Sequence, residues 1–465
     1  MRAIRHLPLF AALLATSAAQ ATPSVVIDIA TGEILQQEQA TQPWFPASVS
    51  KLMTVYVALK SVREGRATMD TPLIVSTRAA RMAPSKMGFR PGLEVTLDNA
   101  LKILMVKSAN DVAVTVAEGL GGSVEGFADR MNAEAAALGM RESHWVNPNG
   151  LPDKRQVTSA RDMALLGRAL YRDFPDQAGL FSIGALQLGP KIMANHNGLI
   201  GRYPGADGMK TGFTCAAGFN VVASATQGGR RLIAVILGAP SAKDRTAKAA
   251  NLFDSAFAGS GGSYGNLANL PSTGGDPPDM RGTACTRRTK GGGFASEIED
   301  FSIPLAHLQG NPDSNSEKYF IFESAGLIKP QPAARGIAAM PRPHFDPVPI
   351  FIGRAPGWTG PAARVVAVAP VPAARAIAAR APKSETQSPE EARAFASPKP
   401  NVLDGSPTAV FADPSVLPLD LQGGIADGGG KKIKKPVAAK PAPARKQVAK
   451  LAKPVARPKL PAAAE

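Results

Sequence analysis

The sequence predicts a domain of the α/β class, of the α+β type, in which helices flank an antiparallel sheet, followed by a long and largely disordered C-terminal region. Two pairs of β-prone segments lie near the two ends of residues 22–258, and helical patterns fill the interval between them. Beyond residue 258 the composition changes to Gly, Pro and Ala with few aromatic residues, which is typical of chain without a packed core.

The first 21 residues are predicted to be a secretory signal peptide. Arg2 and Arg5 precede an apolar run at 7–15, and residues 19–21 form a small-x-small cleavage site. An uncleaved membrane anchor is the alternative, but the run is shorter than the roughly 20 apolar residues that a spanning helix needs. We therefore expect an exported chain, periplasmic or associated with the cell envelope, whose mature N-terminus is Thr22.

The sheet is expected to draw strands from both ends of the domain. Residues 24–29 and 33–36 are β-prone and are joined by Ala-Thr-Gly at 30–32, which indicates a hairpin. Residues 219–225 and 231–237 repeat this pattern around a Gln-Gly-Gly turn. Because the two hairpins are far apart in the sequence, a sheet that contains both is completed only by the end of the domain.

Helices are expected in the interval between the hairpins. Ser123 precedes an amphipathic run that ends at Gly139. Ser159 and Asp162 form a capping pair before a second run at 163–170. Helical segments therefore interrupt the sheet.

The first candidate site is the sequence Pro-Ala-Ser-Val-Ser-Lys at 46–51, which begins a helix-compatible run. Ser48 and Lys51 are three residues apart, so on a helix both side chains lie on one face and the amine can reach the hydroxyl. Ser48 at the helix N-terminus would be the nucleophile. Lys51 would be its base, provided that burial or a second cation lowers the pKa of its amine. Taken alone, the same pattern describes a helix cap followed by a solvated lysine.

A polar break at residues 107–111 interrupts a second amphipathic region. An elbow between two helices can direct the side chains of Ser108 and Asn110 into a cleft. There Ser108 would relay a proton and Asn110 would hold a substrate amide. The alternative is an ordinary cap of the next helix.

The third element is Lys210-Thr211-Gly212, which stands directly before strand-forming sequence. Lys210 would supply the second cation near the catalytic lysine, and Thr211 would offer a hydroxyl to a substrate carboxylate. Gly212 would let another backbone approach the strand closely. The backbone amides of Ser48 and Phe213 would then form an oxyanion hole. Alone, Lys-Thr-Gly is equally compatible with a turn.

Together these three elements resemble the low-molecular-mass penicillin-binding proteins, the serine-type D-alanyl-D-alanine carboxypeptidases. The resembling stretches are PASVSKLMT at 46–54, KSANDVAV at 107–114, WVNPNGLPD at 145–153, NHNGLIGRYPGADGMKTGFT at 195–214 and GFNVVASAT at 218–226. The resemblance implies a serine-β-lactamase-like fold. It also implies removal of the terminal D-alanine from peptidoglycan stem peptides through an acyl-enzyme, with β-lactams as covalent inhibitors.

Three other functions remain open at this point. A D,D-endopeptidase acting on cross-links would use the same residues. A β-lactamase would share the scaffold but needs a second base, typically a Glu, and no Glu occurs between Glu142 and Lys210. A non-enzymatic wall-binding protein would act through residues 431–465, which contain nine Lys and two Arg but only one acidic residue.

Cys215 and Cys285 can form a disulfide in an exported chain, although two buried thiols fit as well. Such a bond would attach the region beyond residue 258 to the catalytic domain. No cofactor is expected, and no metal site, because the His and Cys residues lack the spacing of metal ligands.

Four regions are expected along the chain: a signal peptide at 1–21, a catalytic domain at 22–258, a low-complexity region at 259–430 and a basic tail at 431–465. Two apolar islands, at 319–322 and 348–352, lie within the low-complexity region. The formal net charge of +16 and the basic tail predict contact with anionic envelope polymers. Export argues against nucleic acid as a partner.

Overall fold

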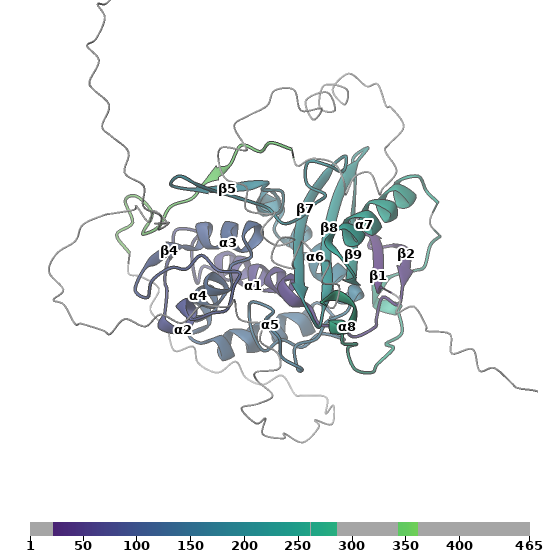
Figure 1. Ribbon diagram of the computed structural model, residues 1–465, viewed down its shortest axis with the longest axis horizontal. Coiled ribbons are helices and arrows are strands. Elements are labelled where there is room, and N and C mark those ends of the chain that lie inside the picture. Colours follow the sequence, from purple (N-terminus) through teal and green to yellow (C-terminus); the bar gives the residue numbers. More distant parts are fainter. Residues whose placement is uncertain (1–21, 261, 286–342, 361–465) are drawn as a thin grey trace, which may run out of the picture. The chain divides into compact units, whose positions relative to one another are not determined.

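The protein is described by a computed structural model that covers residues 22–260, 262–285 and 343–360 (Figure 1). The predicted signal peptide, the apolar island at 319–322 and the basic tail lie outside the described residues. The described strands are β1 (Ser24–Asp28), β2 (Ile34–Glu38), β3 (Pro72–Ile74), β4 (Glu94–Thr96), β5 (Ala185–Leu188), β6 (Lys191–Ala194), β7 (Ala206–Thr214), β8 (Gly218–Gln227), β9 (Arg230–Ala239) and β10 (Val348–Pro349). The described α-helices are α1 (Lys51–Arg63), α2 (Thr77–Ala80), α3 (Leu97–Val106), α4 (Asn110–Gly121), α5 (Val124–Ala137), α6 (Ala160–Asp173), α7 (Ala242–Phe257) and α8 (Arg281–Ala284), with 3-10 helices η1 (Ala47–Ser50), η2 (Pro175–Phe181) and η3 (Leu267–Asn269).

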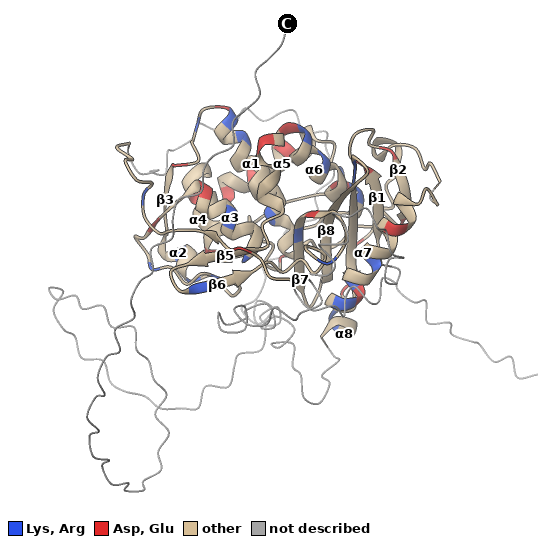
Figure 2. Ribbon diagram, turned by 90° about the horizontal axis from the view of Figure 1, so that it is seen from above, with Lys and Arg blue, Asp and Glu red and all other residues tan. Residues whose placement is uncertain are grey.

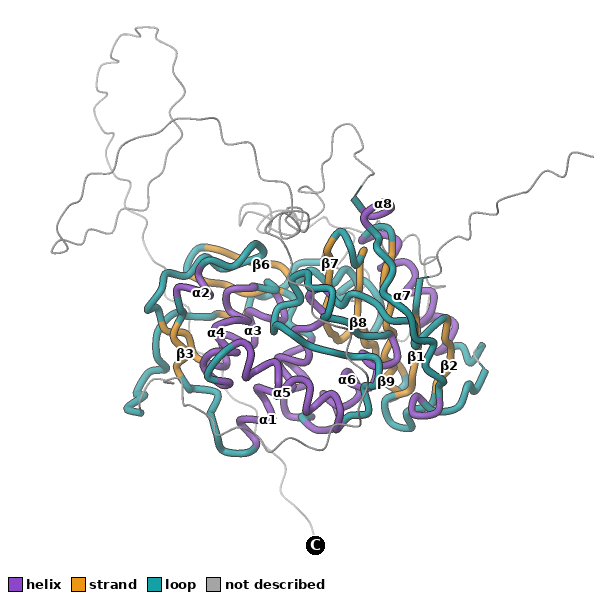
Figure 3. Tube along the Cα trace, turned by 90° about the horizontal axis from the view of Figure 1, so that it is seen from below, coloured by secondary structure: helices purple, strands orange, loops and turns teal. Residues whose placement is uncertain are grey.

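The main sheet of the described residues has five antiparallel strands in the order β2-β1-β9-β8-β7, and Figure 3 shows β7, β8, β9, β1 and β2 side by side. Strands β1 and β2 form the first predicted hairpin, and β8 and β9 form the second. Strand β1 pairs with β9, with Ser24 opposite Ile236. The prediction of a sheet built from both ends of the domain is therefore confirmed.

Helices cover both faces of this sheet because its central strands carry apolar side chains in both directions. In β9, Leu232, Ala234 and Ile236 are buried in a cluster with α7. The alternate residues Ile233, Val235 and Leu237 are buried in the larger core that α1, α3, α4, α5 and α6 share. Figure 1 shows α7 on one face of the sheet and α6 on the other, with α1, α3, α4 and α5 beyond it.

The predicted helix starts within the interval are confirmed. The Ser123 hydroxyl accepts a hydrogen bond from the Gly126 amide at the start of α5. The Ser159 hydroxyl accepts one from the Asp162 amide at the start of α6, 3.1 Å away. Each cap satisfies a backbone donor that has no partner within the helix.

The packed body extends beyond residue 258, where the sequence predicted its end. Residues 262–285 return to the sheet, and the Tyr264 amide donates to the Ile34 carbonyl at 3.0 Å. The buried guanidinium of Arg161 donates from Nε to the Leu267 carbonyl at 2.7 Å. These backbone contacts, which composition does not reveal, hold a Gly- and Pro-rich segment in place, and Leu267 is itself buried.

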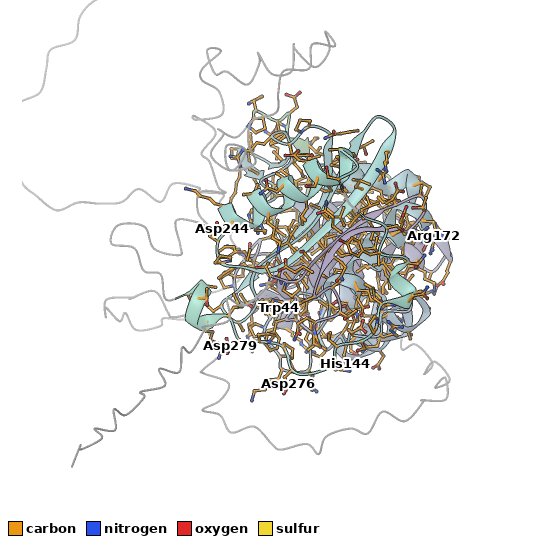
Figure 4. All side chains as sticks on the ribbon, turned by 90° about the vertical axis from the view of Figure 1, so that its right-hand side faces the viewer. Trp44, His144, Arg172, Asp244, Asp276 and Asp279 are labelled. Atoms are coloured by element: carbon orange, nitrogen blue, oxygen red, sulfur yellow. A yellow bond between two sulfur atoms is a disulfide. The ribbon has the colours of Figure 1, made fainter. Side chains whose placement is uncertain are left out.

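A disulfide joins Cys215, in the turn after β7, to Cys285, which follows α8. Nearby, the Met280 amide donates to the Ala216 carbonyl at 3.0 Å, and the Met280 side chain is buried. Figure 4 shows Asp279, the neighbour of Met280, at the margin of the body, whereas Trp44 lies in the interior. The segment beyond residue 258 is thus covalently attached to the end of β7.

A second segment from the C-terminal region also packs on the catalytic domain. Strand β10 pairs in parallel with β5, with Val348 opposite Leu186, and Ile350 is buried. The guanidinium of Arg354 forms an ion pair with Glu94 in β4 at 2.7 Å. The apolar island at 348–352 is therefore part of the packed body.

Acidic and basic residues are intermixed over the helices of the described residues (Figure 2). Most of the chain's excess of Lys and Arg falls outside the described residues. Among the described helices, none combines the length and the hydropathy that crossing a membrane requires.

Candidate active site

Ser48 lies in η1, directly before α1 begins at Lys51. Its side chain is only partly buried, so a ligand can reach it. The preceding residue, Ala47, has a φ of 48°, in the left-handed region that non-glycine residues seldom adopt. Strain of this kind is concentrated at functional sites. The spacing of three residues places Lys51 Nζ 3.0 Å from Ser48 Oγ, as the sequence predicted.

The Lys51 ammonium group is completely buried and has three polar contacts within the described residues. Besides Ser48 Oγ, Nζ lies 2.8 Å from Asn110 Oδ1 and 2.7 Å from the backbone oxygen of Asn149. None of these partners carries a negative charge. A buried amine without an anionic partner is more stable in its neutral form.

The pKa of Lys51 is accordingly well below that of an ordinary lysine. Burial is the main cause, and the positive charge of Lys210 is the second. The carboxylate of Asp111 acts in the opposite direction but does not cancel the other two effects. The two influences that the sequence analysis required, desolvation and a second cation, are both present.

Ser108 lies in the elbow between α3 and α4, and Asn110 is the first residue of α4. Ser108 is buried and has a φ of 61°, and its amide donates to the Ile103 carbonyl at 3.1 Å. Asn110 Nδ2 donates to the Ala83 carbonyl at 2.9 Å, while its Oδ1 accepts from Lys51. One hydrogen of Nδ2 and the Oδ1 atom of Asn110 are thus engaged within the protein, and a contact between Asn110 and a substrate amide stays a prediction.

Lys210, Thr211 and Gly212 lie within strand β7 and do not form a turn. Strand β7 is an edge of the main sheet of the described residues, so one side of its backbone faces the site. The Lys210 side chain is buried, and its Nζ donates to the Thr211 carbonyl at 2.8 Å. Burial, together with the charge of Arg245, lowers the pKa of Lys210 to about 7.

Strand β7 approaches the turn that carries Ser48 at Gly212. A Cβ atom at this position would lie 2.9 Å from the Ser48 amide nitrogen and 3.0 Å from the Pro46 carbonyl oxygen. Both distances are shorter than an ordinary van der Waals contact allows. The absence of a side chain at Gly212 therefore lets the Ser48 amide approach β7 closely.

The chain is similar to known proteins. A family model described as D-alanyl-D-alanine carboxypeptidase matches residues 11–241. The Mycobacterium tuberculosis D-alanyl-D-alanine carboxypeptidase DacB2 is 31% identical over 246 residues, which cover 50% of this chain and 81% of that protein. This chain belongs to the D-alanyl-D-alanine carboxypeptidase family.

Other relatives also match about half of this chain. The Bacillus subtilis D-alanyl-D-alanine carboxypeptidase DacF is 34% identical over 242 residues, which cover 51% of this chain and 62% of that protein. Several curated relatives are covered over only about three fifths of their length. Among solved structures, penicillin-binding protein 6B from Escherichia coli is 35% identical and has a TM-score of 0.48, with 50% of this chain and 75% of that chain covered.

Sequence reasoning assigned no role to Asn149 and Gly150, although both fall in one of the family-like stretches. The Asn149 carbonyl holds the amine of Lys51. Gly150 has a φ of 83°, and a Cβ atom there would lie 1.8 Å from the Ala47 carbonyl oxygen. The loop at 145–153 therefore packs directly on the turn that carries Ser48 in this carboxypeptidase-family protein.

Asp111 was also left without a role in the sequence analysis. Its Oδ1 accepts hydrogen bonds from the amides of Met87, at 3.0 Å, and Val112, at 2.9 Å. Its Oδ2 accepts from the Gly88 amide at 2.8 Å. These bonds fasten the loop before β4 to the elbow. In the described ranges, no group of three or more His, Cys, Asp or Glu residues is placed to hold a metal ion.

Replacing Gly212 with alanine should slow acylation of Ser48 by a β-lactam about 10- to 100-fold. A displacement of the Ser48 backbone by about 1 Å is enough to misplace the reacting atoms. The new Cβ would displace the backbone around Ser48 from β7. Labelling with a fluorescent penicillin measures the rate. Gly179→Ala is the matched control, since nothing lies within 4 Å of a Cβ at that position. Equal labelling rates for the two variants would show that the close approach of Gly212 to Ser48 does not affect acylation.

Proposed function

We propose that this chain is a penicillin-sensitive serine D-alanyl-D-alanine carboxypeptidase that removes the terminal D-alanine from peptidoglycan stem peptides through an acyl-enzyme on Ser48. The observation that carries the proposal is the set of three contacts at Lys51 Nζ. A neutral amine has two hydrogens and one lone pair. The Asn110 Oδ1 and Asn149 backbone oxygens can only accept, so they take the two hydrogens. The lone pair is then directed at the Ser48 hydroxyl, which is able to donate.

Acylation follows from this geometry. Lys51 takes the proton of Ser48 Oγ as that oxygen attacks the carbonyl carbon of the scissile peptide bond. The charge that develops on the carbonyl oxygen is stabilised by the amides of Ser48 and Phe213. The bond to the leaving D-alanine breaks, and its amine receives the proton from Lys51 through the Ser108 hydroxyl. Water then hydrolyses the ester and releases the shortened peptide.

The terminal carboxylate of the substrate binds at the Lys210 and Thr211 end of the site in this proposal. Lys210 is a buried cation when protonated, and Arg245 lies close enough to lower its pKa. An arriving carboxylate compensates both positive charges and favours the protonated form of Lys210. This electrostatic preference favours peptides with a free C-terminus.

Slow deacylation of a β-lactam is expected because no free carboxylate is assigned to activate water. Asp111, next to Asn110 in the chain, uses its two oxygens to accept three backbone hydrogen bonds. It therefore lacks the freedom of a general base. The family membership and this arrangement favour a peptidase over a β-lactamase.

The mature chain should release free D-alanine from an acyl-peptide that ends in D-Ala-D-Ala, and a fluorescent penicillin should label Ser48 durably. Both reactions need the same activated hydroxyl. Chiral analysis of the released amino acid and peptide mapping of the labelled chain measure them. Rapid turnover of the penicillin would instead indicate a β-lactamase, and cleavage of cross-linked muropeptides into their two component peptides, without release of D-alanine from the acyl-peptide, would indicate an endopeptidase.

The site of action in this proposal is the cell envelope outside the cytoplasm. The predicted signal peptide supports it, as does the disulfide between Cys215 and Cys285, since such bonds persist in oxidising compartments. Residues 431–465 are proposed to contact anionic envelope polymers through their Lys and Arg side chains.

A further inference from the structure

Residues 343–354, which we call the strap, run along the edge of β5 that β6 leaves open and end at β4 (Figure 1). The Ile350 amide donates to the Gln187 carbonyl, next to β5's pairing with β10, at 2.8 Å. The Gly353 amide donates to the Glu94 carbonyl in β4 at 2.8 Å. The strap lies beyond the part of the chain that the family model matches, so family membership does not account for it.

The first part of the strap packs against two glycines of the catalytic domain. A Cβ atom at Gly184, directly before β5, would lie 2.3 Å from the Phe345 ring. A Cβ atom at Gly201, in the loop after β6, would lie 2.3 Å from Pro343 Cγ and 2.9 Å from the Phe345 ring. Pro343 is buried, and Phe345 is partly buried. Because packed atoms do not approach so closely, both positions must lack a side chain for the strap to pack as it does.

The loop that contains the second glycine also supports β7. At its start, the Asn195 amide donates to the Gly184 carbonyl at 2.8 Å, and Asn195 Oδ1 accepts from the Asn197 amide at 2.9 Å. Asn197 Nδ2 in turn donates to the Gly208 carbonyl in β7 at 2.7 Å. Both asparagine side chains are buried. A continuous series of contacts therefore leads from the strap to the strand that carries Lys210.

The same loop also contacts Arg245, whose charge lies close to Lys210. Arg245 Nη2 lies 3.5 Å from the His196 carbonyl oxygen. Burial and, second to it, the positive charge of Arg245 lower the pKa of Lys210. On another side of the loop, a Cβ atom at Gly198 would lie 3.0 Å from Thr246 Oγ1 in α7. The loop is thus held between α7 and the strap.

We propose that the strap is a positioning element for the carboxylate-binding end of the site, with Phe345 as its positioning residue. The Phe345 ring supports the loop, and the loop in turn holds β7 and Arg245 in place. This inference rests on the proposed function, because that function places the substrate carboxylate at Lys210. Without the ring the loop relaxes and the groups that bind the carboxylate shift, whereas Ser48 and Lys51 keep their positions.

Replacing Phe345 with alanine in the full chain should raise the KM for an acyl-peptide ending in D-Ala-D-Ala about 2- to 30-fold, the range for residues that act on a site through intervening contacts. The kcat should stay nearly unchanged, since the loss concerns substrate binding and not the reacting atoms. Initial rates at varied peptide concentration measure both constants.

Two further variants serve as controls for this effect. Phe351→Ala is the matched control, because Phe351 lies on the same strap and is 43% exposed, and its KM should not change. Phe345→Leu keeps an apolar side chain against the two glycines, so its KM should stay close to that of the original chain.

A β-lactam and its neutral ester separate positioning from a general loss of stability. Phe345→Ala should slow acylation of Ser48 by the carboxylate-bearing β-lactam by a factor similar to the change in KM. The neutral ester, which has no carboxylate to be bound, should acylate Ser48 at the original rate. Equal slowing with both compounds would mean that the strap supports the fold as a whole, and would overturn the positioning role.

Replacing Gly184 with alanine tests the same contact from the side of the domain. The new Cβ would displace the Phe345 ring, so the KM should rise as it does in Phe345→Ala. When both substitutions are combined, the KM should rise no further than with either alone, because both act through one contact. Effects that multiply in the double variant would show that Gly184 does not act through Phe345.

The outcomes for the strap and for the proposed function are distinguishable. If the KM of Phe345→Ala does not exceed that of Phe351→Ala, the positioning role is overturned and the carboxypeptidase proposal stands. If the original chain does not hydrolyse the peptide, the proposed function is overturned, and the role of the strap with it.

Discussion

Replacing Ser48 with alanine should lower D-alanine release by about 10⁴- to 10⁶-fold, the range seen when a catalytic nucleophile is removed. Without Oγ no acyl-enzyme can form, and the amine of Lys51 loses the only one of its three partners that can donate a proton. Contacts with the substrate carboxylate and the oxyanion would remain, so peptide binding should change little.

Initial rates of D-alanine release, with penicillin labelling in parallel, measure this effect. Ser61→Ala is a control on the same helix, because the Ser61 hydroxyl only donates back to the Val57 carbonyl. That variant should keep nearly full activity. A Ser48→Ala protein that still releases D-alanine at even one hundredth of the original rate would place the nucleophile elsewhere.

Replacing Lys51 with methionine should slow acylation of Ser48 by about 10²- to 10⁴-fold, the usual contribution of a general base. Methionine keeps an apolar chain of similar length, so the buried space stays filled. The carbonyl of Asn149 and the amide of Asn110 each lose one partner, which costs some stability. Thermal unfolding of the variant, compared with its acylation rate by penicillin, separates these two effects.

The pH dependence of the acylation rate tests the role of Lys51 as the base. Protonated Lys51 cannot accept the proton of Ser48, so the acylation rate should rise as pH increases through the lowered pKa of Lys51. In Lys210→Met one of the two causes of that lowering is gone. The pKa of Lys51 then rises, and the ascending limb should move to higher pH. An ascending limb at the same pH in both proteins would contradict the effect of Lys210 on the pKa of Lys51.

For a substrate with a free carboxylate, kcat/KM should fall again above about pH 7 in the original chain. There Lys210, whose pKa is about 7, loses the charge that attracts the carboxylate. A neutral β-lactam ester lacks this carboxylate and should show no descending limb. A descending limb with both substrates would mean that another group is responsible.

Local sequence patterns predicted much of the fold correctly. The two hairpins, the caps at Ser123 and Ser159 and the i,i+3 contact between Ser48 and Lys51 all depend on residues close together in the chain. Short-range turn geometry, capping and helical spacing decide such features. The sequence alone therefore sufficed for them.

The end of the packed body was not predictable in the same way. Residues 262–285 have the composition of a linker, but they are held by the buried Arg161, by a pairing with Ile34 and by the disulfide of Cys285. Each of these partners lies more than 60 residues away in the sequence. Composition predicts whether a segment can form a hydrophobic core of its own. It does not predict whether the segment packs on the core of another part of the chain.

The sequence by itself determined the contact between Ser48 and Lys51 and the polar break at 107–111 between two helices, because each depends on a short stretch of chain. The structure placed Lys-Thr-Gly inside β7. Only the tertiary structure decided which atoms complete the site. The carbonyl of Asn149 reaches Lys51 because Gly150 allows its loop to pack on Ala47. Lys210 lowers the pKa of Lys51 because β7 lies beside η1, which directly precedes α1. Hydrogen bonds and charge effects depend on distance in space, and for these groups the fold alone sets that distance.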